Sequence, residues 1–260
     1  MNGIEYRLKE IIHPQDGRSL IVDASSGLAL GALPGLENFG QGLHPALALV
    51  DGIVCSPGQL RRFSKLTRDE ASLLVRVDWT NTLRGEGFVL PPTDPNRVPI
   101  LSAQDALDLG AVAMVGTLLL GYEEEIEASC MRSIVEWAIT GKVIGMPLIV
   151  EVMTTGPLIS LPGKAIELGA SFALEGGADG IIVPYPGTRS LETVAAFVSV
   201  PWLLKPTGLD TSATELEEAL DLGATGLFLD HRVFGIADPA TTLTSFKAML
   251  HQPASLREVI

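Results

Sequence analysis

Short apolar runs alternate with longer amphipathic stretches along nearly the whole chain. Three of the amphipathic stretches end in Leu-Gly-Ala or a close variant, at residues 109–111, 176–179 and 222–224, and an apolar run follows within two residues. Glycine suits the left-handed cap that ends a helix, and an uninterrupted apolar run suits a parallel strand buried on both faces. We therefore interpret this repeated phrase as the junction between a helix and the next parallel strand.

The same criteria predict eight strands separated by helices. The strands are expected at residues 19–22, 52–54, 73–77, 112–115, 148–152, 180–183, 202–204 and 226–229. Amphipathic helical stretches, for example residues 122–139 and 213–222, lie between them. This alternation predicts an α/β protein that forms a (β/α)8 TIM barrel, as a single domain over residues 1–260. An open doubly wound sheet is the alternative, but the chain has no Gly-x-Gly-x-x-Gly after the first predicted strand and no Walker loop.

The composition predicts a compact protein without a nucleic-acid or membrane partner. Of 260 residues, 47% are hydrophobic and 19% are charged, so the chain can bury a large core. The formal net charge of −13 would repel nucleic-acid phosphates. The apolar stretches are much shorter than the roughly 20 residues of a membrane span, and the N-terminus is too charged for a signal peptide. We therefore expect a cytoplasmic protein.

The two cysteines indicate neither a disulfide framework nor a zinc site, because Cys55 and Cys130 are far apart in the sequence. We expect both to be reduced thiols. Cys55 fits a buried small residue better than a nucleophile, since no histidine partner is evident near it.

Polar residues follow the apolar runs, at the strand ends where barrel enzymes place their active sites. In chain order these are Asp23, Cys55 with Ser56, Asp78, Thr117, Glu151, Pro184 with Tyr185, Lys205, and Asp230 with His231. Four carboxylates and one lysine at one rim would strongly couple one another's protonation. The sequence therefore predicts a polar site at the mouth of the barrel.

Lys205 interrupts the apolar run that begins at Pro201, and it permits two interpretations. A lysine at the mouth of a barrel can lose solvation and expose a neutral amine, which attacks a carbonyl carbon and forms an iminium electron sink. Alternatively, Lys205 is a charged bridge between Asp230 on the next strand and Asp23 on the first. Perturbed lysines occur in both settings.

The remaining rim residues also have catalytic and structural interpretations. Asp23 is a candidate general acid or base, or else the first residue of an Asp-x-Ser-Ser-Gly turn. Glu151 ends an apolar run, where a charge is costly unless it faces the mouth. His231 can act as an acid or base near neutral pH, and Asp78 can cap the following loop. Asp23, Glu151 and Asp230 with His231 could instead chelate Mg²⁺ or Mn²⁺, although no short spacing motif supports a metal.

The order of several segments resembles the DeoC/LacD aldolase family, in particular the DhnA-type class I fructose-bisphosphate aldolases. The segments that carry the resemblance are residues 17–23, 34–37, 57–58 with 61–62, 145–148, 177–179, and 233–234 with 238–239. The resemblance implies a barrel aldolase that forms homo-oligomers. It also implies that Asp23 corresponds to the first-strand aspartate, which takes part in acid–base steps.

The sequence departs from the family at the positions that carry its chemistry. The Schiff-base lysine of the sixth strand aligns with Ile182, and the acid–base tyrosine of the fifth strand aligns with Met153. The phosphate-binding Gly-Arg pair aligns with Asp230 and His231, and a carboxylate there would repel phosphate. Arg232 and the turn at residues 207–208 are possible substitutes, and an aldolase interpretation needs Lys205 as the amine.

The sequence thus predicts an aldolase-like C–C bond lyase or synthase that acts on a small sugar-like or keto-acid-like carbonyl compound. The catalytic residues are expected to be Lys205, Asp23, Glu151, Asp230 and His231. The substrate-binding residues are expected to be Asp78, Tyr185, Thr207, Gly208 and Arg232. No cofactor is expected in this interpretation. The alternatives are a divalent-metal-dependent lyase and a non-catalytic aldolase homologue that binds a metabolite or a partner.

Overall fold

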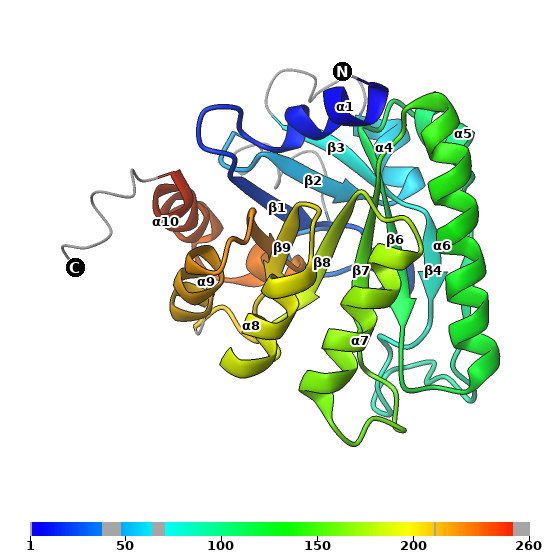
Figure 1. Ribbon diagram of the computed structural model, residues 1–260. Helices are drawn as coiled ribbons and strands as arrows, with labels where there is room; N and C mark the ends of the chain where they lie inside the picture. The colour runs from blue at the N-terminus through cyan, green and yellow to red at the C-terminus, as the bar shows by residue number, and fades with distance from the viewer. Residues whose placement is uncertain (1, 38–47, 64–70, 211, 252–260) are drawn as a thin grey trace.

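Eight parallel strands close into a barrel in the computed structural model, which describes residues 2–37, 48–63, 71–210 and 212–251 (Figure 1). The barrel strands are β1 (Ser19–Asp23), β2 (Gly52–Cys55), β3 (Ser72–Arg76), β6 (Ala113–Leu119), β7 (Leu148–Met153), β8 (Gly180–Pro184), β9 (Trp202–Lys205) and β10 (Gly226–Leu229). They are hydrogen-bonded in chain order, and β10 closes the barrel against β1. All eight predicted strands are confirmed, and the predicted single (β/α)8 barrel with them.

Helices surround the barrel and connect its strands (Figure 1). The described helices are α1 (Gly3–Ile11), α2 (Gly27–Leu30), α4 (Pro57–Phe63), α5 (Ala103–Asp108), α6 (Glu124–Ile144), α7 (Pro162–Glu175), α8 (Thr188–Phe197), α9 (Ser212–Asp221), the 3-10 helix η1 (His231–Gly235) and α10 (Pro239–His251). Gly110, Gly177 and Gly223 have φ values of 81°, 93° and 94°, so one glycine in each copy of the repeated phrase adopts the predicted left-handed conformation. Over the described residues, none of these helices is both long enough and apolar enough to cross a membrane.

An antiparallel ribbon that the sequence did not predict follows β3. It consists of β4 (Asp78–Thr80) and β5 (Arg97–Pro99), with Asp78 opposite Pro99. Asp78, which was expected at the end of the third strand, therefore begins this ribbon. The ribbon lies beside the mouth of the barrel and contributes to the wall of the cavity described below.

Side chains fill the barrel interior in layers taken from alternate strands. Ile21, Leu74, Ile149 and Leu203 come from β1, β3, β7 and β9, and Val54, Val115, Ile182 and Phe228 come from the strands between them. These eight side chains form one buried apolar cluster, with Ile11 of α1 at its N-terminal end. Such alternation is typical of TIM barrels. Because side chains alternate across a strand, the next inward positions on β1, β3, β7 and β9 lie two residues further on, and all four are charged.

Candidate active site

The four charged residues at these positions form a chain of three ion pairs across the mouth of the barrel. Arg76 Nη2 lies 3.0 Å from Asp23 Oδ2, and Arg76 Nη1 lies 2.8 Å from Glu151 Oε2. Lys205 Nζ donates to Glu151 Oε1 at 2.6 Å. We call Asp23, Arg76, Glu151 and Lys205 the charged layer. The first three are at most 7% exposed, whereas the side chain of Lys205 is 23% exposed and is the member that solvent reaches.

Arg76 is the functional residue that the sequence reasoning missed. It lies inside the third predicted strand, whereas the candidate site residue of that strand was Asp78, which follows its end. A signal was present, because Arg76 interrupts an apolar run two residues after an inward-facing leucine, as Lys205 does on β9. A buried guanidinium needs carboxylate partners, and here Asp23 and Glu151 supply them.

The turn after β1 fixes the carboxylate of Asp23. Asp23 Oδ1 accepts from the backbone N–H of Ser25 at 2.7 Å and from its hydroxyl at 2.5 Å. Asp23 therefore makes the turn contacts of the structural interpretation and, with its other oxygen, binds Arg76 at the cavity. The two interpretations of this residue are compatible.

The pKa values of the charged layer are set by burial and by these partners. Burial by itself raises the pKa of Glu151, but Lys205 and Arg76 outweigh it and lower that pKa to about 2. Burial by itself lowers the pKa of Lys205, but the Glu151 carboxylate outweighs it and the pKa is raised. Lys205 is therefore a cation at neutral pH. Two carboxylates alternate with two cations in this layer, because Arg76 lies between Asp23 and Glu151.

The ion-pair partner of Lys205 is not the one that its structural interpretation predicted. Lys205 was expected to bridge Asp230 and Asp23, but its hydrogen bond goes to Glu151. Its Nζ lies 6.0 Å from the centroid of the Phe228 ring, so the ammonium group lies next to the buried apolar cluster of the barrel interior. Ile182, at the position aligned with the family's lysine, is 1% exposed and belongs to the same buried apolar cluster.

A small cavity of about 90 Å³ lies over the charged layer. Its polar lining includes all five predicted catalytic residues, which are Lys205, Asp23, Glu151, Asp230 and His231, together with Arg76, Asp78 and Thr117. The apolar part of the lining is formed by Leu28, Ala29, Trp79, Leu83 and Met153. Trp79 donates from Nε1 to the carbonyl of Leu28 at 3.1 Å, which holds the β4–β5 ribbon against α2. The cavity thus combines charged and apolar side chains.

Asp78 connects the ribbon to the barrel. Its Oδ2 is 2.9 Å from Arg97 Nε and accepts from the backbone N–H of Thr117 at 2.7 Å. Its Oδ1 accepts from the Thr117 hydroxyl, and Arg97 stacks over Trp137 at 4.8 Å from the ring centroid. Asp78 lines the cavity, but both of its oxygens already have donors. Its role in substrate binding stays a prediction.

Asp230 and His231 stand at the start of η1, beside Lys205 in the cavity lining. Asp230 accepts from the backbone N–H of Arg232 at 2.9 Å and forms an ion pair with its guanidinium at 2.7 Å. Burial raises the pKa of Asp230, but Arg232 outweighs it and the pKa is lowered. His231 Nδ1 is buried and has no hydrogen-bond partner among the described residues.

Four predicted substrate-binding residues lie outside the lining of this cavity: Tyr185, Thr207, Gly208 and Arg232. The Tyr185 hydroxyl donates to Glu218 at 2.6 Å, and Thr207 donates from its backbone and hydroxyl to Glu215. These hydrogen bonds connect the segments that follow β8 and β9 to α9. Direct contact of these residues with substrate stays a prediction.

The acidic residues of the mouth do not converge on one point. In the described part of the chain, Asp23, Glu151 and Asp230 form no group whose ligand atoms lie within 4.8 Å of one another. Asp23 and Glu151 each bind Arg76, so a cation between them would have to displace a buried guanidinium. The alternative of Mg²⁺ or Mn²⁺ at these residues stays a prediction.

Lysine, arginine and carboxylate side chains around one cavity, at the C-terminal ends of eight parallel strands, are the features of an aldolase-type (β/α)8 barrel. Comparisons with known proteins agree. The chain is 25% identical to the 3-hydroxy-5-phosphonooxypentane-2,4-dione thiolase of Enterobacter sp. (strain 638) over 259 residues, which cover 98% of this chain and 84% of that protein. It is also 25% identical to an uncharacterized aldolase of Pasteurella multocida over 252 residues, covering 96% of this chain and 83% of that one. No family model matches the sequence.

Solved structures extend the likeness in fold. A Schiff-base-forming fructose-1,6-bisphosphate aldolase superposes with a TM-score of 0.79 at 19% identity, covering 95% of this chain and all of that one. An archaeal fructose 1,6-bisphosphate aldolase gives 0.76 at 19% identity, over 95% and 98% of the two chains. The resemblance to the DeoC/LacD and DhnA-type aldolases is thus confirmed, and in sequence and fold the chain is aldolase-like.

Proposed function

We propose that this protein is a C–C bond lyase or synthase that binds a small carbonyl compound at the mouth of the barrel and reacts with it through Lys205. The observation that carries the proposal is the Lys205 ammonium group, which lines the cavity and is hydrogen-bonded to Glu151. Relatives named as thiolase and aldolase support a carbonyl substrate. Glu151 and Asp23 would handle protons, and Asp230 and His231 would orient the substrate.

The reaction balances with groups at the cavity. Once Lys205 has lost its extra proton, its nitrogen attacks the carbonyl carbon, and loss of water leaves a protonated imine. The bond between the α- and β-carbons of the imine then breaks as a base takes the proton from the β-hydroxyl group. The β-carbon leaves as an aldehyde or ketone, and the electron pair of the broken bond moves toward the imine nitrogen to give an enamine. Protonation of the enamine and hydrolysis release the second product. The synthase direction is the reverse.

The first step sets a requirement on Glu151. Because Lys205 is a cation in the resting site, its proton must leave before the nitrogen can attack. Glu151 accepts the hydrogen bond from Lys205, yet its own low pKa makes it a weak base. A substrate that enters the cavity displaces water and so removes solvation from both charges, which favours transfer of the proton to give a neutral pair. The site is thus expected to react with carbonyl compounds faster as the pH rises.

The test is mass spectrometry of the intact protein after borohydride reduction with a panel of small aldehydes and ketones, phosphorylated and not. We expect one stable adduct, which peptide mapping assigns to Lys205 and which Lys205→Met abolishes. Lys164→Met is the matched control, because Lys164 lies exposed on α7, where it pairs with Glu167. A folded protein that forms no adduct with any carbonyl, or the same adducts after Lys205→Met, would exclude the Schiff base.

The second candidate function is a non-catalytic homologue that binds a metabolite. The observation that favours it is the complete pairing of the charged layer, which leaves the lysine protonated. Such a protein would bind a panel compound, seen as a rise in melting temperature, without borohydride adducts and without turnover. Adducts on Lys205 together with product formation would contradict it.

We also propose that the protein forms a homo-oligomer. Val135, Ile139 and Val143 stand four residues apart along α6 and are 40%, 62% and 82% exposed. Residues with this spacing share one face of a helix. A large exposed apolar stripe is typical of an interface between subunits. The number of subunits follows from light scattering of the purified protein.

A further inference from the structure

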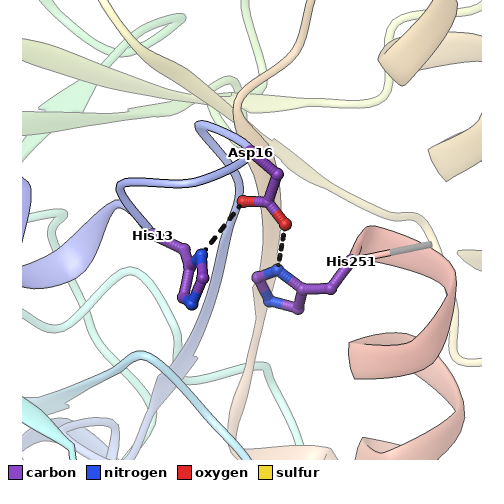
Figure 2. A group of neighbouring side chains, drawn as sticks. All are labelled: His13, Asp16 and His251. Atoms are coloured by element: carbon purple, nitrogen blue, oxygen red, sulfur yellow. Dashed lines mark hydrogen bonds and ion pairs between the residues drawn. The ribbon is translucent and has the colours of Figure 1, made fainter. Parts of the chain in front are cut away.

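A second cluster of titratable side chains lies at the opposite end of the barrel from the charged layer. His13 and Asp16 belong to the loop before β1, and His251 ends α10 (Figure 2). His251 Nδ1 lies 2.6 Å from Asp16 Oδ2, and His13 Nδ1 lies 3.5 Å from Asp16 Oδ1. Figure 2 shows the two imidazole rings on either side of the one carboxylate.

A second carboxylate lies next to the cluster. Asp51 stands directly before β2, and its Oδ2 is 3.5 Å from His251 Nε2. The same oxygen accepts from the backbone N–H of Leu20 at 2.7 Å, which anchors Asp51 against β1. Two imidazoles and two carboxylates therefore gather from three separate segments of the chain.

Two nitrogen atoms of this cluster lack a hydrogen bond. His13 Nδ1 and His251 Nε2 are buried atoms without a hydrogen bond among the described residues. Each lies 3.5 Å from a carboxylate oxygen, so it loses the hydration it would have in water and gains an ion pair but no hydrogen bond. A bound cation would supply a direct partner for one of these nitrogens. This observation adds to the charges of the cluster and points to a cation as its ligand.

The spacing of the donor atoms fits one ion. One ligand atom from each of His13, Asp16 and His251 lies within 4.8 Å of the others, and no other group of this kind occurs in the described residues. Ligands of a tetrahedral zinc ion are roughly 3.3 Å apart, given metal–ligand bonds of about 2.0 Å. Small rotations of the two histidine side chains would therefore bring the donors onto a common centre.

We propose that His13, Asp16 and His251, with Asp51 beside them, bind one divalent transition-metal ion of the zinc type. Imidazole donors favour zinc, cobalt and nickel over magnesium and calcium, which prefer oxygen ligands. Two carboxylates also balance the charge of a divalent ion held by neutral histidines. The inference does not depend on the reaction proposed for Lys205.

Such an ion would be structural. It would fasten the end of α10, the last described helix, to the loop that enters β1 and to the segment that enters β2. The N-terminal end of a TIM barrel contributes stability, whereas catalysis belongs to the other end. Joining residues 13 and 251 closes a loop of nearly the whole chain, which is where a cross-link restricts the unfolded state most.

Cobalt and zinc, added as simple salts to the chelator-treated protein, test the proposal. We expect one equivalent of Co²⁺ to give the visible absorption bands of a bound ion, and Zn²⁺ to remove them. Zn²⁺ at a hundredfold excess over its dissociation constant should raise the melting temperature by about 5 °C. Absence of the bands and of any thermal shift with the wild-type protein would overturn the proposal.

Variants locate the site. His13→Ala, His251→Ala and Asp16→Asn should each weaken Co²⁺ binding at least tenfold, whereas His231→Ala, at the other end of the barrel, should bind as the wild type does. Binding that survives both histidine substitutions, or that His231→Ala abolishes, would place the ion elsewhere and overturn the proposal. If a variant does not fold, chemical modification of the wild-type histidines replaces it: Zn²⁺ should protect His13 and His251 but not His231.

Discussion

Glu151 and Lys205, 54 positions apart in the sequence, are joined by a hydrogen bond of 2.6 Å in the mouth of the barrel. The pair lies beside the cavity, and Arg76 binds the second oxygen of the same carboxylate. Glu151 is thus a buried anion shared by two cations. Five expected outcomes follow from this arrangement and from the surface of α6.

Glu151→Gln should make Lys205 more reactive at neutral pH while weakening the fold. Removing the carboxylate removes the largest cause that raises the pKa of Lys205, so burial is then opposed only by Asp230 and Asp23 and the pKa should fall. We expect faster borohydride-trapped adduct formation at pH 7 than with the wild-type protein, measured by intact mass. Glu192→Gln, on the exposed side of α8, serves as the control. A slower reaction in Glu151→Gln would mean that losing Glu151 as the proton acceptor outweighs the larger fraction of neutral amine.

Arg76→Met should destabilise the protein by about 3–5 kcal/mol, because it leaves the buried carboxylates of Asp23 and Glu151 without their shared partner. Urea unfolding followed by circular dichroism measures the loss. Arg189→Met removes an exposed arginine of α8 and should change the stability by less than roughly 0.5 kcal/mol. Equal effects of the two substitutions would mean that the charged layer adds nothing to the fold.

The stability should fall as the pH drops below about 4.5. The pKa of Glu151 is about 2 in the folded protein, below its ordinary value of 4.5, so its contribution is complete above pH 4.5 and is lost as the pH falls toward 2. The contribution is on the order of 3 kcal/mol. Urea unfolding at several acidic pH values should show a steeper decline for the wild-type protein than for Glu151→Gln. Parallel curves for the two proteins would contradict this assignment.

Adduct formation at Lys205 should depend on pH in the neutral to alkaline range. The pKa of this lysine is raised, so the neutral amine becomes more abundant as the pH increases toward and beyond 10. The rate of borohydride-trapped adduct formation should therefore rise between pH 7 and pH 9 without levelling off. A plateau below pH 8 would indicate a neutral lysine in the resting site. The stability measured over the same range serves as the control for unfolding.

Substitutions on α6 should dissociate the proposed oligomer. Ile139→Glu and Val143→Glu put a charge on the exposed apolar stripe, and burying that charge between subunits is costly. Light scattering should report a smaller mass than for the wild-type protein. Glu192→Gln, on the exposed side of α8, should leave the mass unchanged. An unchanged mass in both apolar variants would place the interface elsewhere.

The sequence by itself determined the barrel and the place of its site. Apolar runs, glycine caps and strict alternation are local signals, and eight such units have one common closed arrangement, so every predicted strand was found. Parallel strands in a barrel also end at the same rim. This is why Lys205, Asp23, Glu151, Asp230 and His231 could be expected around one cavity before any contact between them was known.

The tertiary structure alone decided which of these charges meet. Closure of the barrel places β1, β3, β7 and β9 in one interior layer, and only that closure brings Arg76 between Asp23 and Glu151. It also gives Lys205 a carboxylate from β7 in place of the expected partner on β10. Tyr185 and Thr207 likewise donate hydrogen bonds to Glu218 and Glu215 of α9, and both lie outside the cavity lining. Such pairings depend on the reach of long side chains across the barrel, for which the spacing along the chain carries no signal.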